Sequence, residues 1–252
     1  YTVSPVHTLD SWLDLAKRIE DAGADSVAIK DMAGLLKPND AFELVSNLKE
    51  KISVPIHMQT HATTGFSTAT NMKAIEAGID NIDTSISSMS MTYGHTATET
   101  IISMFDHTKF FSDIDKNLFP ELSSHFKKIR KKYELYEGSL KGVDASMLIN
   151  QVPGGMLSNL ESQLREMDAD DKFEDVLNEI PRVRQDLGFV PLVTPSSQIV
   201  GAQSLFNVLD GERYKHLNIE TVNLILGKYG KVPGKINKNL SNLAKKVKQE
   251  KQ

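Results

Sequence analysis

Strand-like and helix-like segments alternate at a nearly constant interval through the first hundred residues, and this alternation restricts the fold more than any other feature. The segments "DSVAIKD", "VPIHMQTH" and "NIDTSIS" begin near residues 25, 54 and 81 and are separated by amphipathic stretches with a helical period. With "YTVS" at the start, they predict about four βα units. This pattern is typical of a parallel sheet covered by helices, either a doubly wound sheet or part of a (β/α)8 barrel.

The polar side chains of these segments favour the barrel. His57, Gln59 and His61 occupy alternate positions of "VPIHMQTH", so in a strand they point to the same side. The other two segments alternate in the same way, with Lys30 and Asp83 among their polar residues. A barrel mouth, where inward side chains meet a ligand, explains a polar side shared by all three strands. A complete barrel needs eight strands, so residues 1–105 are predicted to form a partial one.

The character of the sequence changes after about residue 105. Residues 106–234 contain a series of helical patterns separated by turns such as "VPGG" and "TPSS", so this region is predicted to be mainly helical. Residues 235–252 form a Lys-rich tail, expected as a solvated helix or a frayed end.

Composition excludes several classes of function. The net charge is −4, which gives no reason to expect nucleic acid as a partner. The chain has no cysteine, so any metal must be bound through nitrogen and oxygen atoms. No apolar run approaches 18 residues and no signal peptide is evident, so a cytoplasmic location is expected.

Several motifs resemble one family, in order along the chain. "DSVAIKDMAGLLKP", "VPGGMLSNLESQL" and "FVPLVTPSSQIVGAQSLFNVLDGERYK" are similar to the carboxyltransferase domain of biotin-dependent enzymes. These enzymes are the pyruvate carboxylases, the α subunit of oxaloacetate decarboxylase and the 5S subunit of transcarboxylase. The resemblance implies a (β/α)8 barrel followed by a helical region, with strands 5–8 of the barrel in this chain. It also implies carboxyl transfer between carboxybiotin and pyruvate or oxaloacetate.

The resemblance further implies a divalent metal, Zn, Co or Mn, at the barrel mouth. In the family it is held by an Asp of the first strand, an H-x-H pair and a carbamylated Lys, and it polarises the keto acid carbonyl. By position, Lys30 matches the Lys, His61 matches the second His, and Gln59 stands in place of the first. An amide oxygen is a weaker and harder donor than imidazole, so metal affinity should drop. The alternatives are a rim lysine paired with Asp31 and a hydrogen-bonded structural histidine at position 61.

Hydroxyl and imidazole groups follow the last predicted strand. In the pyruvate carboxylases a Thr at this place is thought to shuttle a proton, and the matching position here is Tyr93, with Thr92 beside it. Thr92 and Tyr93 are therefore the candidate catalytic residues. His57, Ser90 and His95 are expected to line the substrate or biotin pocket.

The resemblance also implies partners. No biotinyl "MKM" motif occurs in the sequence, so biotin is expected on a biotinyl carrier protein or a missing segment. Biotin carboxylase or membrane decarboxylase subunits are further possible partners, and a homo-oligomer is expected, because unpaired strand edges favour association. One alternative is a non-catalytic scaffold or decayed fragment of such a subunit. Another is a metal-dependent lyase or aldolase with the same kind of barrel.

Overall fold

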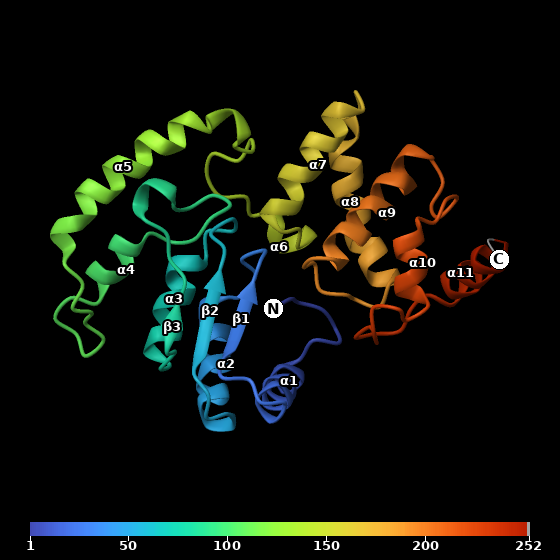
Figure 1. Cartoon of the computed structure of the whole chain (residues 1–252). Helices are drawn as coiled ribbons and strands as arrows, with labels where there is room; N and C mark the ends of the chain where they lie inside the picture. Colours follow the sequence, from blue (N-terminus) through green and yellow to red (C-terminus); the bar gives the residue numbers. More distant parts are fainter. Residues whose placement is uncertain (251–252) are drawn as a thin grey trace. The chain divides into compact units, whose positions relative to one another are not determined.

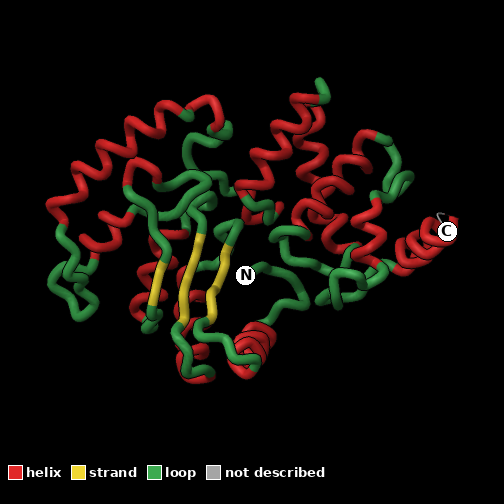
Figure 2. The backbone as a smooth tube through the Cα atoms, in the orientation of Figure 1, coloured by secondary structure: helices red, strands yellow, loops and turns green. Residues whose placement is uncertain are grey.

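Three parallel strands form the only sheet among residues 1–250, which are the residues that the computed structural model describes. They are β1 (Val27–Asp31), β2 (Ile56–Thr60) and β3 (Asn81–Ile82), and they lie side by side in that order (Figures 1 and 2). The register places Lys30 opposite Gln59. The sheet supports the predicted βα organisation.

The predicted strand at residues 1–4 is not formed. Ser4 makes only an isolated antiparallel bridge with His7, and Pro5 between them has no amide hydrogen to donate to a ladder. The strand prediction for this segment was therefore wrong.

Helices α1 (Leu9–Asp21), α2 (Pro38–Lys51) and α3 (Ser67–Glu76) pack on the strands through apolar side chains. Thr8 and Ser11 form a capping box at the start of α1, and Pro38 occupies the first turn of α2. The hydrophobic core lies on the side of the sheet that these helices cover, and Ile56 and Met58 of β2 are fully buried in it. The opposite side of β1 and β2 is left for the polar residues.

The rest of the first compact unit follows the sheet. It contains η1 (Ser87–Met89), α4 (Thr98–Met104), η2 (Lys116–Leu118), α5 (Phe119–Lys132) and η3 (Glu134–Tyr136), and α6 (Met147–Asn150) lies at its end. This unit comprises Tyr1–Thr2 and Thr8–Ile149. The amide of Asp144, for example, donates to the carbonyl of Thr63 over 2.7 Å. The compact unit thus extends past residue 105, where the sequence changes character.

The second unit comprises Val3–His7 and the chain from Asn150 onwards. It consists of α7 (Gly154–Glu166), η4 (Asp170–Lys172), α8 (Phe173–Asp186), α9 (Ser196–Leu209), α10 (Ile219–Ile225) and α11 (Lys238–Glu250). The mainly helical character predicted for this part of the chain is confirmed.

Helix α11 lies in the segment expected as a solvated helix, and most of its surface is exposed, but one face of it is buried. Leu240 and Ala244 are buried, at 3% and 0% exposure, and α11 packs on α10. The spacing of four residues places both side chains on one helical face. Residues 251 and 252 of the predicted tail lie outside the described residues. Among the described helices, none combines the length and apolarity that a membrane crossing requires.

Candidate active site

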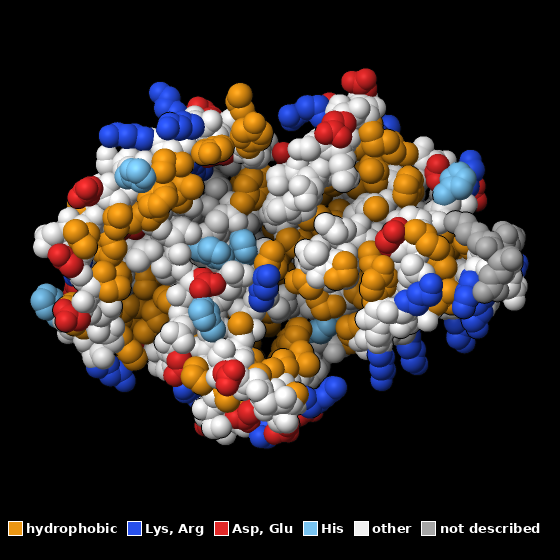
Figure 3. All heavy atoms as spheres, viewed as in Figure 1, with side chains coloured by type: hydrophobic (Ala, Val, Ile, Leu, Met, Phe, Trp, Pro, Cys, Tyr) orange, Lys and Arg blue, Asp and Glu red, His pale blue; other side chains and the backbone are white. Residues whose placement is uncertain are grey.

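The polar face of the sheet begins with Lys30. In β1, buried side chains alternate with exposed ones, and Lys30 is on the exposed side. Because Lys30 lies opposite Gln59 in the parallel register, the two side chains emerge from neighbouring strands on the same side. Figure 3 shows histidine, acidic and basic side chains gathered over this part of the first unit.

Asp83, just after β3, joins two of the predicted residues. Its Oδ1 lies 2.6 Å from Nε2 of His57, and its Oδ2 accepts a hydrogen bond of 3.1 Å from Nε2 of Gln59. An ionised carboxylate can only accept, so the amide nitrogen of Gln59 must face Asp83 and the amide oxygen points elsewhere. Asp83 therefore fixes the orientation of both side chains.

His61 and His95 form a second group at the carboxyl end of β2. Their ring centroids are 4.5 Å apart. Nδ1 of His61 donates to the carbonyl of Tyr93 over 2.6 Å, and Nδ1 of His95 donates to the carbonyl of Thr60 over 3.0 Å. A carbonyl can only accept, so each ring carries a proton on Nδ1, and its Nε2 is the nitrogen left without a partner among these bonds.

Burial keeps His61 neutral. It lowers the pKa of the imidazole below its ordinary value, while the hydrogen bond to the Tyr93 carbonyl acts in the opposite direction. The Nε2 of His61 is therefore available as a proton acceptor or a metal ligand at neutral pH.

Asp31 does not pair with Lys30. Its side chain is fully buried on the other side of β1 and accepts hydrogen bonds of 2.9 Å from the amides of Leu35 and Leu36 and from the hydroxyl of Thr60. Burial raises the pKa of the Asp31 carboxyl, and these hydrogen bonds oppose the rise. No ion pair joins Lys30 to Asp31, so the alternative of a paired rim lysine is not supported by the structure of the described residues.

Gly34 allows the loop after β1 to lie against the end of β2. Its φ is +66°, and a Cβ added there would be 2.5 Å from the carbonyl oxygen of His61. Neither the backbone conformation nor the space suits a larger residue. Asp31 and Gly34 together hold this loop next to the histidine.

The loop after β3 places the candidate catalytic residues. Met91 and Thr92 have left-handed backbone conformations, with φ of 64° and 51°. Such a conformation is unusual for a β-branched residue and is often found at functional sites. The Tyr93 hydroxyl accepts a hydrogen bond of 3.3 Å from the Leu140 amide, so its ring is directed towards residues 138–140. Thr92 and Tyr93 therefore stay candidates for proton transfer, with the Tyr93 hydroxyl already engaged by the Leu140 amide.

Ser90 is not brought to the polar face by any interaction. It is buried, at 8% exposure, and its hydroxyl donates to the carbonyl of Ser87 over 2.8 Å. This hydrogen bond closes the turn η1, which gives Ser90 a structural role in that turn.

The donors on the polar face do not fit the transition-metal site that the resemblance implies. Within the described residues, no three His, Asp or Glu side chains come together as metal ligands. His61 and His95 each offer one imidazole nitrogen, whereas Gln59 offers an amide oxygen and Lys30 only an amine unless it is carbamylated. An amide oxygen is a poor ligand for Zn or Co compared with imidazole.

Sequence reasoning did not single out Asp83 or Asp31 as site residues. The alternation in "NIDTSIS" puts Asp83 on the polar side, but its partners depend on the register of β3 against β2. For Asp31 the sequence did contain a signal, because the residue ends a strand and is followed by the turn "MAG". The backbone amides in and after such a turn need an acceptor, which a carboxylate can supply.

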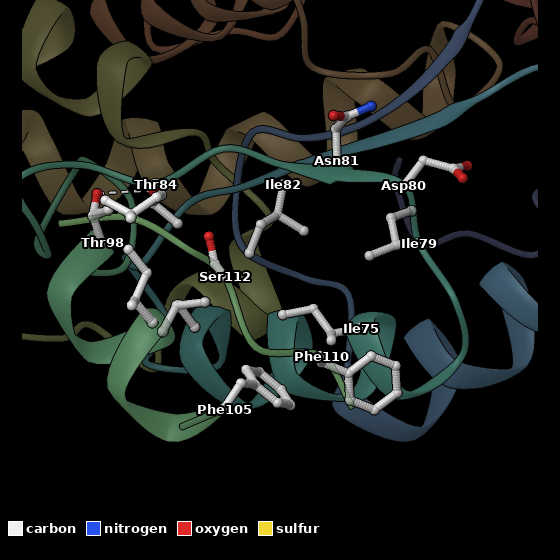
Figure 4. A pocket seen from close by; sticks show the side chains of 13 residues that line it. Ile75, Ile79, Asp80, Asn81, Ile82, Thr84, Thr98, Phe105, Phe110 and Ser112 are labelled. Carbon is white, nitrogen blue, oxygen red and sulfur yellow. Dashed lines mark hydrogen bonds between the residues drawn. The ribbon is translucent and has the colours of Figure 1, made fainter. Parts of the chain in front are cut away.

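An apolar cavity of about 370 Å³ lies elsewhere in the first unit. Figure 4 shows Phe105, Phe110 and Ile75 on one side of it and Ile82 on the other. The hydroxyls of Thr84 and Thr98 are hydrogen-bonded over 2.8 Å at its edge. Its lining contains none of the predicted site residues, so it is separate from the polar face.

Comparison with known proteins agrees with the division of the chain into two units near residue 150. The HMGL-like family matches residues 6–125, and a conserved carboxylase domain matches residues 147–252. The chain is 52% identical to a pyruvate carboxylase subunit of Methanocaldococcus jannaschii, over 95% of the chain and 42% of the relative. It is 48% identical to the methylmalonyl-CoA carboxyltransferase 5S subunit of Propionibacterium freudenreichii, over 92% of the chain and 46% of the relative.

A solved structure shows the same fold. The carboxyl transferase domain of Rhizobium etli pyruvate carboxylase with pyruvate and biocytin superposes with a TM-score of 0.90 at 28% identity, and the match covers 96% of this chain and 43% of that one. The fold is therefore part of a TIM barrel of the HMGL-like class followed by a helical carboxylase region. The chain belongs to the carboxyltransferase domain family of biotin-dependent enzymes. It spans less than half the length of the curated relatives that it matches.

Proposed function

We propose that the chain is part of a subunit that transfers a carboxyl group between carboxybiotin and pyruvate or oxaloacetate. The observation that carries this proposal is the polar face at the carboxyl ends of β1 and β2, where a lysine, an amide and a neutral histidine meet on a scaffold shared with the carboxyltransferases. A site at the carboxyl ends of barrel strands is the usual place for catalysis in this fold.

The reaction moves protons and stabilises an enolate, and this chain offers groups for both tasks. As a cation, Lys30 would attract the carboxylate of the keto acid and the developing enolate oxygen. Nε2 of His61 is a neutral acceptor, and the Thr92 hydroxyl is the proposed proton carrier between pyruvate and biotin. His57 and Gln59, held by Asp83, would shape the pocket. No step is assigned to a metal, because the donors present do not fit one.

The partners are proposals of the same kind. Biotin would arrive on a carrier domain of another chain or segment, and a biotin carboxylase or a membrane decarboxylase subunit would complete the enzyme. A non-catalytic scaffold is the second candidate function, and the glutamine at position 59 favours it. The lyase or aldolase alternative lacks such support, because the conserved carboxylase domain follows the barrel.

The reaction can be tested with the natural full-length protein that carries this sequence. We expect it to convert oxaloacetate to pyruvate faster when free biotin is added, because biotin accepts the carboxyl group in the reverse direction. Pyruvate formation is followed with and without biotin. A folded protein that shows no biotin-dependent turnover would contradict the enzyme proposal and favour the scaffold.

Substitution of Lys30 by Ala is expected to lower kcat/KM for this reaction by about 10²–10³, because an electrostatic contact with the reacting group is lost. Lys51→Ala is the control. Lys51 ends α2 and precedes β2, so it lies near the amino end of β2, whereas Lys30 lies near the carboxyl end of β1. Lys30→Arg separates two roles of the lysine. Partial activity is expected if Lys30 acts as a cation, whereas a carbamate function would be lost completely. If Lys30→Ala is as active as the natural protein, Lys30 acts neither as a cation nor as a carbamate in the reaction.

Substitution of Gln59 by His is expected to raise bound Zn or Co at least tenfold. The new imidazole could donate one ring N–H to Asp83 and offer its other nitrogen to a metal, an arrangement that typically strengthens binding 10–100-fold. Metal content is measured by elemental analysis after dialysis against each ion. Gln163→His, on the exposed side of α7, is the control. One equivalent of metal in the natural protein, with no gain in the variant, would show that Gln59 is already an adequate ligand.

A further inference from the structure

An apolar groove lies in the second unit, between the start of α9 and the loop that connects α10 with α11. Its volume is about 250 Å³. Most of its lining is apolar and includes Pro191, Ile199 and Leu224, with Tyr229 and Lys231 on the loop side. Tyr229 is 51% exposed, so its aromatic side chain forms part of the rim. No residue of the polar face on the sheet lines this groove.

Close backbone contacts hold the loop side of the groove in place. The amide of Gly234 donates to the carbonyl of Gly188 over 2.8 Å, and the amide of Asn237 donates to the carbonyl of Asp186 over 2.8 Å. Gly188 has a φ of +80°, and a Cβ added there would be 2.8 Å from the carbonyl oxygen of Gly234. Only glycine suits this approach of two backbone segments. The groove is therefore built into the fold of the second unit.

The chain around the groove is strongly basic. Between Glu220 and Glu250 the sequence has no acidic residue, whereas it has seven lysines, all of them exposed. They are Lys228, Lys231, Lys235, Lys238, Lys245, Lys246 and Lys248. None of these lysines forms an ion pair within residues 1–250. Figure 3 shows basic side chains gathered around α11 and the loop before it. In a chain with a net charge of −4, this is a local excess of positive charge.

Asp186 contacts this segment but does not neutralise the lysines. Its Oδ1 accepts a hydrogen bond of 2.9 Å from the side-chain amide of Asn237. Its Oδ2 accepts hydrogen bonds of 2.8 Å from Arg213 and 2.7 Å from the hydroxyl of Tyr214. Both carboxylate oxygens are thus occupied, and Arg213 already balances the charge. The exposed lysines therefore attract an anionic group from outside the unit.

We propose that the groove binds an extended acidic peptide segment of a partner protein. One apolar side chain of the segment enters the groove, and its acidic side chains lie beside Lys231 and the neighbouring lysines. The volume is below the range of about 300–1,000 Å³ that is typical of small-molecule sites, so it suits one side chain of a longer segment. Grooves lined by aromatic side chains are a common way of holding extended peptides.

The concave shape favours a peptide over a membrane surface. Basic patches that bind anionic lipids act through charge close to the lipid surface, and apolar side chains that assist them protrude into the lipid. A lipid surface would leave the groove unfilled, whereas a peptide uses both the groove and the lysines. This binding surface is additional to the proposed carboxyl transfer and requires none of its residues.

Fluorescence anisotropy with a labelled peptide tests the proposal on the natural full-length protein. The probe is a run of glutamates with one leucine in the middle. Replacing the glutamates by glutamines is expected to weaken binding at least tenfold, because the attraction to the lysines is lost. Replacing the leucine by serine is expected to weaken binding at least fivefold, because the apolar contact with the groove is lost. Equal binding of the leucine and serine peptides would contradict the role of the groove.

Matched lysine variants locate the charged part of the site. Lys231→Glu is expected to weaken binding of the leucine peptide at least fivefold. Lys215→Glu, with the same change in net charge, is the control, because Lys215 is exposed and follows the other end of α9. Helix α9 has 14 residues and is about 20 Å long, roughly twice the distance over which 0.1 M salt screens a charge. Equal weakening by both variants would indicate general attraction to a basic protein and would refute a defined site.

Tyr229→Ala links the groove to the leucine of the probe. This variant is expected to weaken binding of the leucine peptide at least fivefold and to leave binding of the serine peptide unchanged, because only the first peptide fills the groove. Circular dichroism confirms that each variant is folded.

Either of two outcomes would overturn the proposal. A folded natural protein that does not bind the leucine peptide would show that the groove is not a peptide site. Vesicles of phosphatidylglycerol that bind more tightly than the peptide, with a loss of binding in Lys231→Glu but not in Tyr229→Ala, would assign the lysines to a membrane surface instead.

Discussion

Substitution of Asp31 by Ala is expected to destabilise the first unit by about 3–5 kcal/mol. The change leaves two buried amides and one buried hydroxyl without their acceptor, and each such group costs about 1–3 kcal/mol. Trp12 is the only tryptophan and packs against the core of this unit, so its fluorescence during urea unfolding measures the effect.

Two controls define the Asp31 result. Asp25→Ala, at an exposed position before β1, should shift stability by no more than about 0.5 kcal/mol. Thr60→Val removes only one of the three donors and should cost about 1 kcal/mol. An Asp31→Ala protein that unfolds at the natural urea midpoint would mean that the carboxylate does not organise the loop after β1.

Substitution of Glu179 by Ala is expected to destabilise the second unit by about 3–5 kcal/mol. Glu179 is 4% exposed and accepts hydrogen bonds of 2.8 Å from Asn207 and 2.5 Å from Arg213. Removing it leaves the partly buried Arg213 with one fewer counter-ion and Asn207 without an acceptor, which is far costlier than loss of a surface pair. Circular dichroism should show an early helical transition, while the Trp12 fluorescence transition keeps its midpoint.

Arg182→Ala is the matched control for Glu179. Its guanidinium also pairs with Glu179, over 2.9 Å, but its side chain is 61% exposed. Such a pair contributes about 0–1 kcal/mol. If Arg182→Ala and Glu179→Ala are equally destabilising, the buried network of α8 and α9 is not the source of the stability.

Much of the fold could be predicted because its signals are local. Alternation defined β1 and β2, and Pro38 marked the start of α2. The third strand was expected across "NIDTSIS", but β3 has only two residues. Beyond it, the amide of Ser85 donates to the carbonyl of Thr96, and the amide of Thr98 donates to the carbonyl of Ser85. Residues 96–98 thus make the hydrogen bonds that were expected for the end of the third strand. They lie more than ten positions after Ser85, so the sequence pattern of the strand itself gives no sign of them.

The candidate site was only partly predictable. Alternation placed Lys30, Gln59 and His61 on one side of two strands, which the register supports. The link from Asp83 to Gln59 depends on how β3 aligns with β2, and no pattern within one strand carries that information. Their roles in binding metal or substrate remain predictions.

The hydrogen bond from Arg184 to the carbonyl of Val3 spans 181 positions of sequence. Residues Val3–His7 belong to the second unit although the chain then continues into the first. During synthesis these early residues cannot reach their place until the arginine has left the ribosome, and closing so long a loop is entropically costly and slow. The second unit is discontinuous, so a fragment that starts at residue 150 would lack one of its own pieces. Complementation with a peptide of residues 1–8 would then be required to recover its full stability.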